Sequence, residues 1–160
     1  MNISKLLINN TPLNDNSWLT DFIEADDNFY IRYSTNIICK FNLEQRMIYS
    51  KTKENYFNIL NKISLFLNVK LAIRKRSNYK NSYYKIKVEN QNSINILINY
   101  LNKYSLLSSK YLDYLDYLEW EKSFRIIENK IHKYEQGKII ILEAINNMNN
   151  KRTYFNWDLL

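Results

Sequence analysis

The sequence predicts an α+β protein in which a four-stranded antiparallel sheet carries helices on one face only. Three observations predict this fold. Segments with helical spacing of apolar residues alternate with pairs of strand-like segments, the two members of each pair lie close together in the chain, and apolar and polar residues alternate along each strand. Hairpins placed between helices are typical of an antiparallel sheet with one covered face.

The expected elements follow the order α-β-β-α-β-β-α, with further helices toward the C-terminus. A first helix is expected over residues 17–26, with Asn16 or Ser17 as its N-cap. The strands are expected at 28–34, 36–43, 69–76 and 83–89, and the other helices at 55–67, 93–104, 109–132 and 138–148. We expect three regions: a lead-in over 1–16, a main domain over 17–132 and a helical extension over 133–160.

Successive residues of a strand point to opposite faces of a sheet, so the alternation separates two sets of side chains. The first set should face the core: Phe29, Ile31, Tyr33, Ile37, Cys39, Phe41, Leu43, Leu71, Ile73, Tyr84, Ile86 and Val88. The second should share the uncovered face: Tyr30, Arg32, Lys40, Asn42, Lys70, Arg74, Arg76, Lys85 and Lys87. Like charges side by side repel, so the second set favours a polyanionic partner such as nucleic acid over an ordinary solvated face.

The charge distribution agrees with a polyanionic partner. The chain of 160 residues has a formal net charge of +7, but residues 28–90 alone carry thirteen basic and three acidic residues. A single cysteine, Cys39, excludes an internal disulfide and fits a reducing compartment. No apolar run approaches the roughly 20 residues of a membrane span, so no membrane partner is expected.

Residue choice indicates an AT-rich gene. Asn, Ile, Lys and Tyr, which AT-rich codons encode, number 25, 21, 17 and 14. The N-terminal stretch is too polar for a signal peptide and lacks the arginines of a transit peptide. These features suggest an organelle-encoded protein that works in the mitochondrial matrix, and an AT-rich bacterial or viral source is the alternative.

Four acids lie close together at 21, 24, 26 and 27. On a helical wheel the apolar arc contains Trp18, Leu19, Phe22 and Ile23, and Thr20 falls on the opposite side. Asp26 alone projects within the arc, at the helix C-terminus, where the helix dipole disfavours a negative charge. Asp26 is therefore either a ligand of a divalent metal such as Mg²⁺ or an acid at a frayed helix end in water.

The stretch "WLTDFIEADDNFYI" resembles the motif of LAGLIDADG homing endonucleases, with residues 19–27 matching its nine positions in order. The resemblance continues through "FNLEQ" at 41–45, "LINYLNKYSLLSSKYLDYL" at 97–115 and "NNMNNKRTYFNWD" at 146–158. It covers nearly the whole chain. Within the family, the chain resembles fungal mitochondrial intron proteins in particular. The lead-in resembles the segment before the second motif of two-motif members.

This resemblance implies a saddle-shaped sheet that binds in the DNA major groove, and two units packed through their motif helices. It implies that Asp26 and the Ala25 backbone carbonyl bind Mg²⁺ or Mn²⁺, that Gln45 lies near the nucleophilic water, and that Lys110 assists catalysis electrostatically. It also places Asp21 and Ala25 at the seam with a second copy or a second motif-bearing chain.

Two departures separate this chain from the family pattern. Asp21 and Asp27 stand at motif positions that are usually glycine. Two Asp21 carboxylates facing each other in a symmetric dimer would cost several kcal/mol unless paired or protonated. Three functions therefore remain open: a metal-dependent, intron-encoded DNA endonuclease, a cleavage-deficient RNA-binding maturase or ribosome component, and a DNA-binding module without metal.

One further pattern bears on the choice between DNA and RNA. Tyr111, Tyr114, Tyr117 and Trp120 recur at a spacing of three on the expected helix 109–132. They form either a strip on which RNA bases stack or a stripe buried against the core, and the buried stripe is favoured.

Overall fold

The computed structural model describes residues 12–75, 82–106 and 111–151, without the side chains of 24–28, 111 and 150. Its centre is a four-stranded antiparallel sheet in the order β1-β2-β4-β3. The strands are β1 (Asp27–Arg32), β2 (Ile38–Arg46), β3 (Leu71–Lys75) and β4 (Ser82–Val88). Both hairpins pair strands that the sequence predicts as neighbours, which confirms the α+β class.

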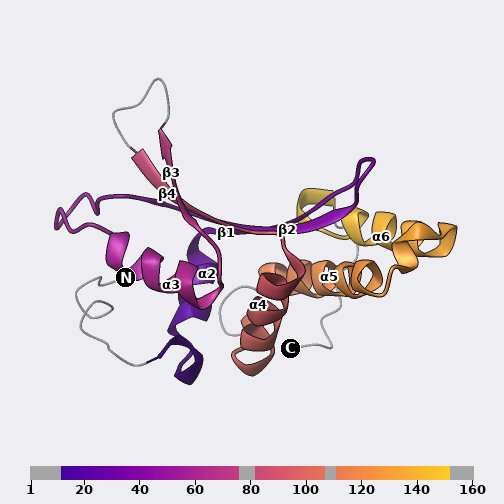
Figure 1. The fold of residues 1–160 in the computed structure, drawn as a ribbon, viewed down its shortest axis with the longest axis horizontal. Helices are drawn as coiled ribbons and strands as arrows, with labels where there is room; N and C mark the ends of the chain where they lie inside the picture. The colour runs from indigo at the N-terminus through magenta and orange to yellow at the C-terminus, as the bar shows by residue number, and fades with distance from the viewer. Residues whose placement is uncertain (1–11, 76–81, 107–110, 152–160) are drawn as a thin grey trace.

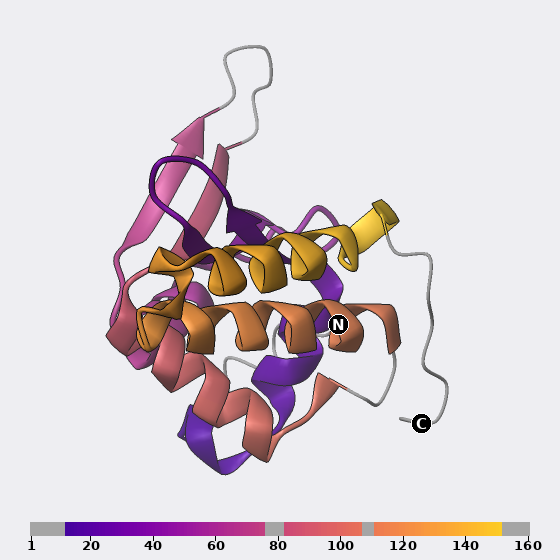
Figure 2. The same cartoon turned by 90° about the vertical axis from the view of Figure 1, so that its right-hand side faces the viewer.

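Helices cover one face of this sheet. Figure 1 shows α2 (Trp18–Asp26), α3 (Phe57–Phe66), α4 (Gln91–Lys103) and α5 (Tyr111–Glu128) on the same side of the strands. The last helix, α6 (Glu135–Asn146), packs on α5 and lies beside the β1–β2 connection (Figure 2). Short 3-10 turns at Leu13–Asp15, Ile131–Lys133 and Asn149–Lys151, called η1, η3 and η4, complete the described chain.

The core between sheet and helices is aromatic where α5 crosses β1 and β2. The Trp120 side chain is fully buried, and its ring centroid lies 5.1 Å from that of Phe29. Its indole Nε1 donates a hydrogen bond of 3.0 Å to the backbone oxygen of Lys40. Tyr117 is 2% exposed. The aromatic stripe of α5 is therefore part of the core at these two positions, which leaves no stacking surface for RNA there.

Two residues expected in the core are exposed. Tyr33 is 39% exposed because β1 ends at Arg32, one residue before it. Ile73 is 60% exposed, and the β3–β4 hairpin extends beyond the helical layer in Figure 1. For Ile73, which pairs with buried Tyr84, strand alternation gives the correct face but does not show how far the helices reach.

Among the described residues, no helix is both long enough and apolar enough to cross a bilayer.

The lead-in is fastened to the helical layer by polar contacts. The Tyr100 hydroxyl donates to the backbone oxygen of Asn16 at 2.8 Å, and Lys103 Nζ donates to that of Asn14 at 2.9 Å. These bonds fix the segment that leads into α2.

Candidate nucleic-acid interface and metal centre

The face of the sheet away from α2–α5 is called the open face here. The strand register places its side chains in cross-strand pairs: Tyr30 with Lys40, Asn42 with Lys87, Glu44 and Ala72 with Lys85, and Arg46 and Arg74 with Tyr83. Arg32 and Lys87 are exposed on it, as is Lys70 just before β3, whereas Tyr30, Asn42 and Lys85 are half-buried. Arg76 lies outside the described residues.

Lys40 does not stand free on this face, contrary to the expectation from alternation. The residue is 6% exposed, and its Nζ lies 2.9 Å from Oε2 of Glu89. Glu89 directly follows Val88, which pairs with Phe41, so the carboxylate stands across from Lys40. The hydrogen bond from Lys40 lowers the pKa of Glu89, and the same bond raises the pKa of Lys40. Lys87 adds a second contact to Glu89 at 3.2 Å.

A second glutamate also lies among the cations. Glu44 accepts a hydrogen bond of 2.8 Å from Nη1 of Arg74. The open face is thus basic but also contains glutamate side chains. The sequence prediction for this face omitted Glu44, Arg46 and Tyr83. The period-two pattern could have found all three, because they continue the phase of Lys40 along β2 and of Lys85 along β4. Glu44 and Arg46 were missed because the strand was expected to end at 43, whereas β2 runs to Arg46. Tyr83 was missed although it lies within the expected strand 83–89.

One polar atom of the open face is left over. Oδ1 of Asn42 is shielded from solvent and has no hydrogen-bond partner within the part of the chain that the structure describes.

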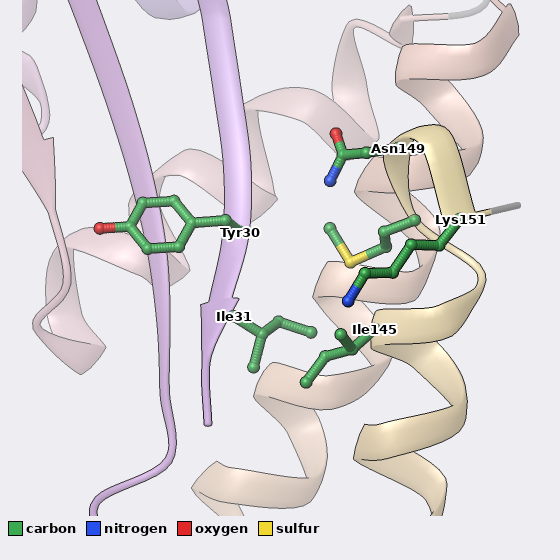
Figure 3. A pocket seen from close by; sticks show the side chains of 6 residues that line it. Tyr30, Ile31, Ile145, Asn149 and Lys151 are labelled. Atoms are coloured by element: carbon green, nitrogen blue, oxygen red, sulfur yellow. The ribbon is translucent and has the colours of Figure 1, made fainter. Parts of the chain in front are cut away.

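Figure 3 shows the outer side of β1 nearby, where Tyr30 and Ile31 point in different directions and Ile31 points toward Ile145 of α6. Tyr30 therefore takes the open-face direction that alternation predicts.

The expected metal residues meet at the junction of α2 and β1. Asp26 is the last residue of α2 and Asp27 the first of β1, so the helix runs directly into the strand. Asp27 pairs with Leu43, which places Gln45, half-buried, two residues farther along β2 at the same end of β1. Lys110, and the side chains of Ala25 and Asp26, lie outside what the structure describes.

Asp26 carries a carboxylate and Ala25 a backbone carbonyl, and oxygen atoms of both kinds are ligands that Mg²⁺ accepts. Magnesium is commonly held by one or two carboxylates together with substrate phosphates and water. No group of three or more His, Cys, Asp and Glu side chains among the described residues forms a separate metal cluster.

The motif helix is buried on more than one side. Leu19, Phe22 and Ile23 are buried as expected, but Thr20 is also only 2% exposed, which contradicts its place on the solvent side of the wheel. The Thr20 hydroxyl donates to the backbone oxygen of Tyr104 at 2.8 Å, so α4 covers this side. Asp21 is exposed, which leaves its edge of the helix as the surface open to a partner.

Comparison with known proteins agrees with this architecture. Residues 19–121 match the family described as LAGLIDADG endonuclease. The intron-encoded DNA endonuclease aI3 of Saccharomyces cerevisiae is 31% identical, over 99% of this chain and 43% of that protein. The probable intron-encoded DNA endonuclease aI1 of Mycosarcoma maydis is 37% identical, over 72% of this chain and 96% of that protein.

Solved structures share the fold at lower identity. The homing endonuclease I-TnaI superposes with a TM-score of 0.67 at 19% identity, covering 86% of this chain and 88% of that one. I-GzeII, solved in complex with its DNA target, gives 0.69 at 20%, covering 91% of this chain and 46% of that one. This chain therefore spans less than half of the Saccharomyces cerevisiae relative and of I-GzeII. The family match over most of the chain, the identity to these relatives and the shared fold together show that this chain belongs to the LAGLIDADG endonuclease family.

Proposed function

We propose that this chain is an intron-encoded endonuclease module that binds duplex DNA through the open face and cleaves it with a divalent metal. The observation that carries the proposal is the open face itself. Exposed Arg32, Arg46 and Lys87 lie on one side of a sheet whose other side the helices α2–α5 cover. Arginine and lysine side chains can reach both phosphates and guanine edges in a major groove.

Asn42, half-buried on the open face, supports the same assignment. Adenine presents a matching donor and acceptor to an asparagine side chain in the major groove. Asn42 pairs across the sheet with Lys87, which would place a cation beside the base contact.

For the chemistry, Asp26 and the Ala25 carbonyl would hold Mg²⁺ or Mn²⁺ at the end of α2. A metal bound there would supply hydroxide at neutral pH and stabilise the charge that develops on the phosphate. Gln45 would orient water at the same end of β1, and Lys110 would stabilise negative charge. A second α2, from another copy or another motif-bearing chain, would pack against the exposed Asp21 edge. The two units together would then cut both DNA strands.

The AT-rich residue choice supports a mitochondrial origin for this chain, and relatives named as intron-encoded endonucleases support an intron as its source. The cleavage-deficient alternative is favoured by one observation, the exposed carboxylate of Asp21 at the proposed seam. A maturase or ribosome component would use the basic face on RNA and would not need Asp26.

The test is Asp26→Asn, with Asp15→Asn as the matched control because Asp15 is an exposed acid of η1. Duplex cleavage with Mg²⁺ is measured on a library of randomised sites, and binding is measured by fluorescence anisotropy. We expect Asp26→Asn to abolish cutting and retain binding, while Asp15→Asn behaves as wild type. Cutting by Asp26→Asn at the wild-type rate would refute the site. Tighter binding of the wild type to structured intron RNA than to any duplex would favour the maturase.

A further inference from the structure

The helix α6 lies along the outer edge of β1, and two hollows mark where it does so. One, of about 610 Å³, is lined by the β1–β2 turn on one side and by His132, Lys133 and Lys138 on the other. The second, of about 220 Å³, is lined by Tyr30 and Ile31 of β1 and by Ile145, Met148, Asn149 and Lys151 (Figure 3). The first lies at the start of α6 and the second just past its end.

Lysines stand at both ends of this helix. Lys133 and Lys151 are exposed, and Lys138 is half-buried. Lys138 contacts Glu135 at 3.5 Å, but Glu135 is 85% exposed, so this pair is weak. We call Lys133, Lys138 and Lys151 the flanking lysines.

The flanking lysines continue the positive charge of the open face. Arg32 is the last residue of β1 and is exposed, and Tyr33, the next residue, already lines the first hollow. At the other hollow, Lys151 lies on the same side of β1 as Ile31, and the Tyr30 ring points away from it toward the open face (Figure 3). A polyanion lying on the open face would therefore meet further cations where it passes the edge of β1.

The first hollow also has polar walls suited to phosphate. Tyr33 and Thr35 line it and carry hydroxyl groups, which are common partners of phosphate oxygens, whereas the Ser34 hydroxyl donates to the backbone oxygen of Asn36 at 3.2 Å. The hollow thus combines hydroxyl groups with lysines.

We propose that α6 and the β1–β2 turn form a second contact surface, which binds the phosphate backbone of duplex DNA beside the part held by the sheet. This inference rests on the proposed DNA binding and assigns a role to the C-terminal extension. Lysine contacts to phosphate are sequence-independent, so this surface raises affinity for every duplex and adds no base readout.

The test measures how the affinity for a duplex of about 30 base pairs falls with salt, because each phosphate contact adds about 0.9 to the slope of log K against log salt. The variants are Lys133→Gln, Lys151→Gln and their double. The control is Lys122→Gln, an exposed lysine of α5 in the covering layer. We expect each single variant to reduce the slope by about 0.9 and the double by about twice that, with no change for the control. Lys133→Arg should keep the wild-type slope.

A second measurement reports proximity directly. Cys39 is buried and its pKa is raised to about 12 by burial, so it reacts slowly with alkylating reagents. A Ser34→Cys variant should then carry the one reactive thiol in the described part of the chain. Bound duplex should slow its alkylation several-fold, whereas Lys122→Cys should react as fast with DNA as without it.

The outcomes separate the two proposals. If Arg46→Gln, at an exposed cation of the open face, lowers the slope while Lys133→Gln and Lys151→Gln leave it at the wild-type value, the second surface is wrong and the open face stands. If the flanking variants lower the slope and Arg46→Gln does not, the sheet assignment is wrong. If the wild-type protein binds no duplex at all, both proposals are refuted.

Discussion

Replacing Glu89 by glutamine should weaken the fold and strengthen DNA binding at the same time. Glu89 contacts two cations, Lys40 at 2.9 Å and Lys87 at 3.2 Å, on the surface proposed to meet phosphate. Glutamine keeps the shape and one acceptor but removes the negative charge. The nearly buried Lys40 ammonium then loses its counterion, and the exposed Lys87 ammonium becomes available to an anion.

The stability change follows from the burial of each partner. A hydrogen bond to a charged group contributes about 1.5–3 kcal/mol, but the Glu89 side chain is 41% exposed, so solvent screens the pair and the lower end applies. The Lys87 contact joins two exposed groups and adds at most about 0.5 kcal/mol. We expect a loss of about 1.5 kcal/mol in the free energy of unfolding. For a chain of this length that corresponds to roughly 5 °C in the melting temperature.

The binding change is opposite in sign. Lys87, released from Glu89, should steepen the salt dependence of duplex binding by about 0.9, the contribution of one phosphate contact. The assays are thermal unfolding followed by circular dichroism and anisotropy titration from low to high salt. The control is Glu143→Gln, the same chemical change on exposed α6, which should alter neither quantity. A Glu89→Gln protein that melts at the wild-type temperature, or that binds DNA more weakly, would refute this account of the open face.

Three further predictions concern pH, the partner edge and the last helix. The lowered pKa of Glu89 means that its pairing stabilises the fold above the ordinary glutamate pKa. This contribution should be lost as pH falls through the lowered value. In acid-unfolding curves, the stability difference between wild type and Glu89→Gln should therefore shrink below about pH 4. Asp21→Gly removes the exposed carboxylate at the α2 edge and should tighten self-association at least tenfold in sedimentation, whereas an unchanged monomer would argue against that seam. Gly137→Ala should cost about 3 kcal/mol in denaturant unfolding, because a Cβ there would clash with the backbone oxygen of Ile131. A loss smaller than about 1 kcal/mol would show that η3 can move.

Much of the fold could be predicted because it depends on periodicity. The helix expected over 55–67 is α3 at Phe57–Phe66, and the strand expected over 83–89 is β4 at Ser82–Val88. Both carry a clear period, 3.6 for the helix and 2 for the strand, and each period encodes which face is buried. Local pattern therefore fixed the order and type of these elements.

The site was harder to predict, because it depends on what lies across the sheet. Alternation assigned Lys40 to the open face, but only the pairing of β2 with β4 brings Glu89 beside it. Thr20 shows the same limit for a helix. A helical wheel cannot reveal that the Thr20 hydroxyl donates a hydrogen bond to the backbone oxygen of Tyr104, at the C-terminal end of α4. Contacts between segments some fifty to eighty residues apart carry no local signal.

The packing of α2 has a consequence for anyone who mutates the motif in search of new variants. Leu19, Thr20, Phe22 and Ile23 touch the protein's own interior, whereas Asp21 touches none of it closely enough to be buried. A random library over this helix would therefore divide into two classes. Most changes at the buried positions 19, 20, 22 and 23 would be eliminated by misfolding before any activity is assayed. Position 21, the one exposed side chain among those that the structure describes on α2, could vary widely in a folded protein, so a selection for altered assembly can start there.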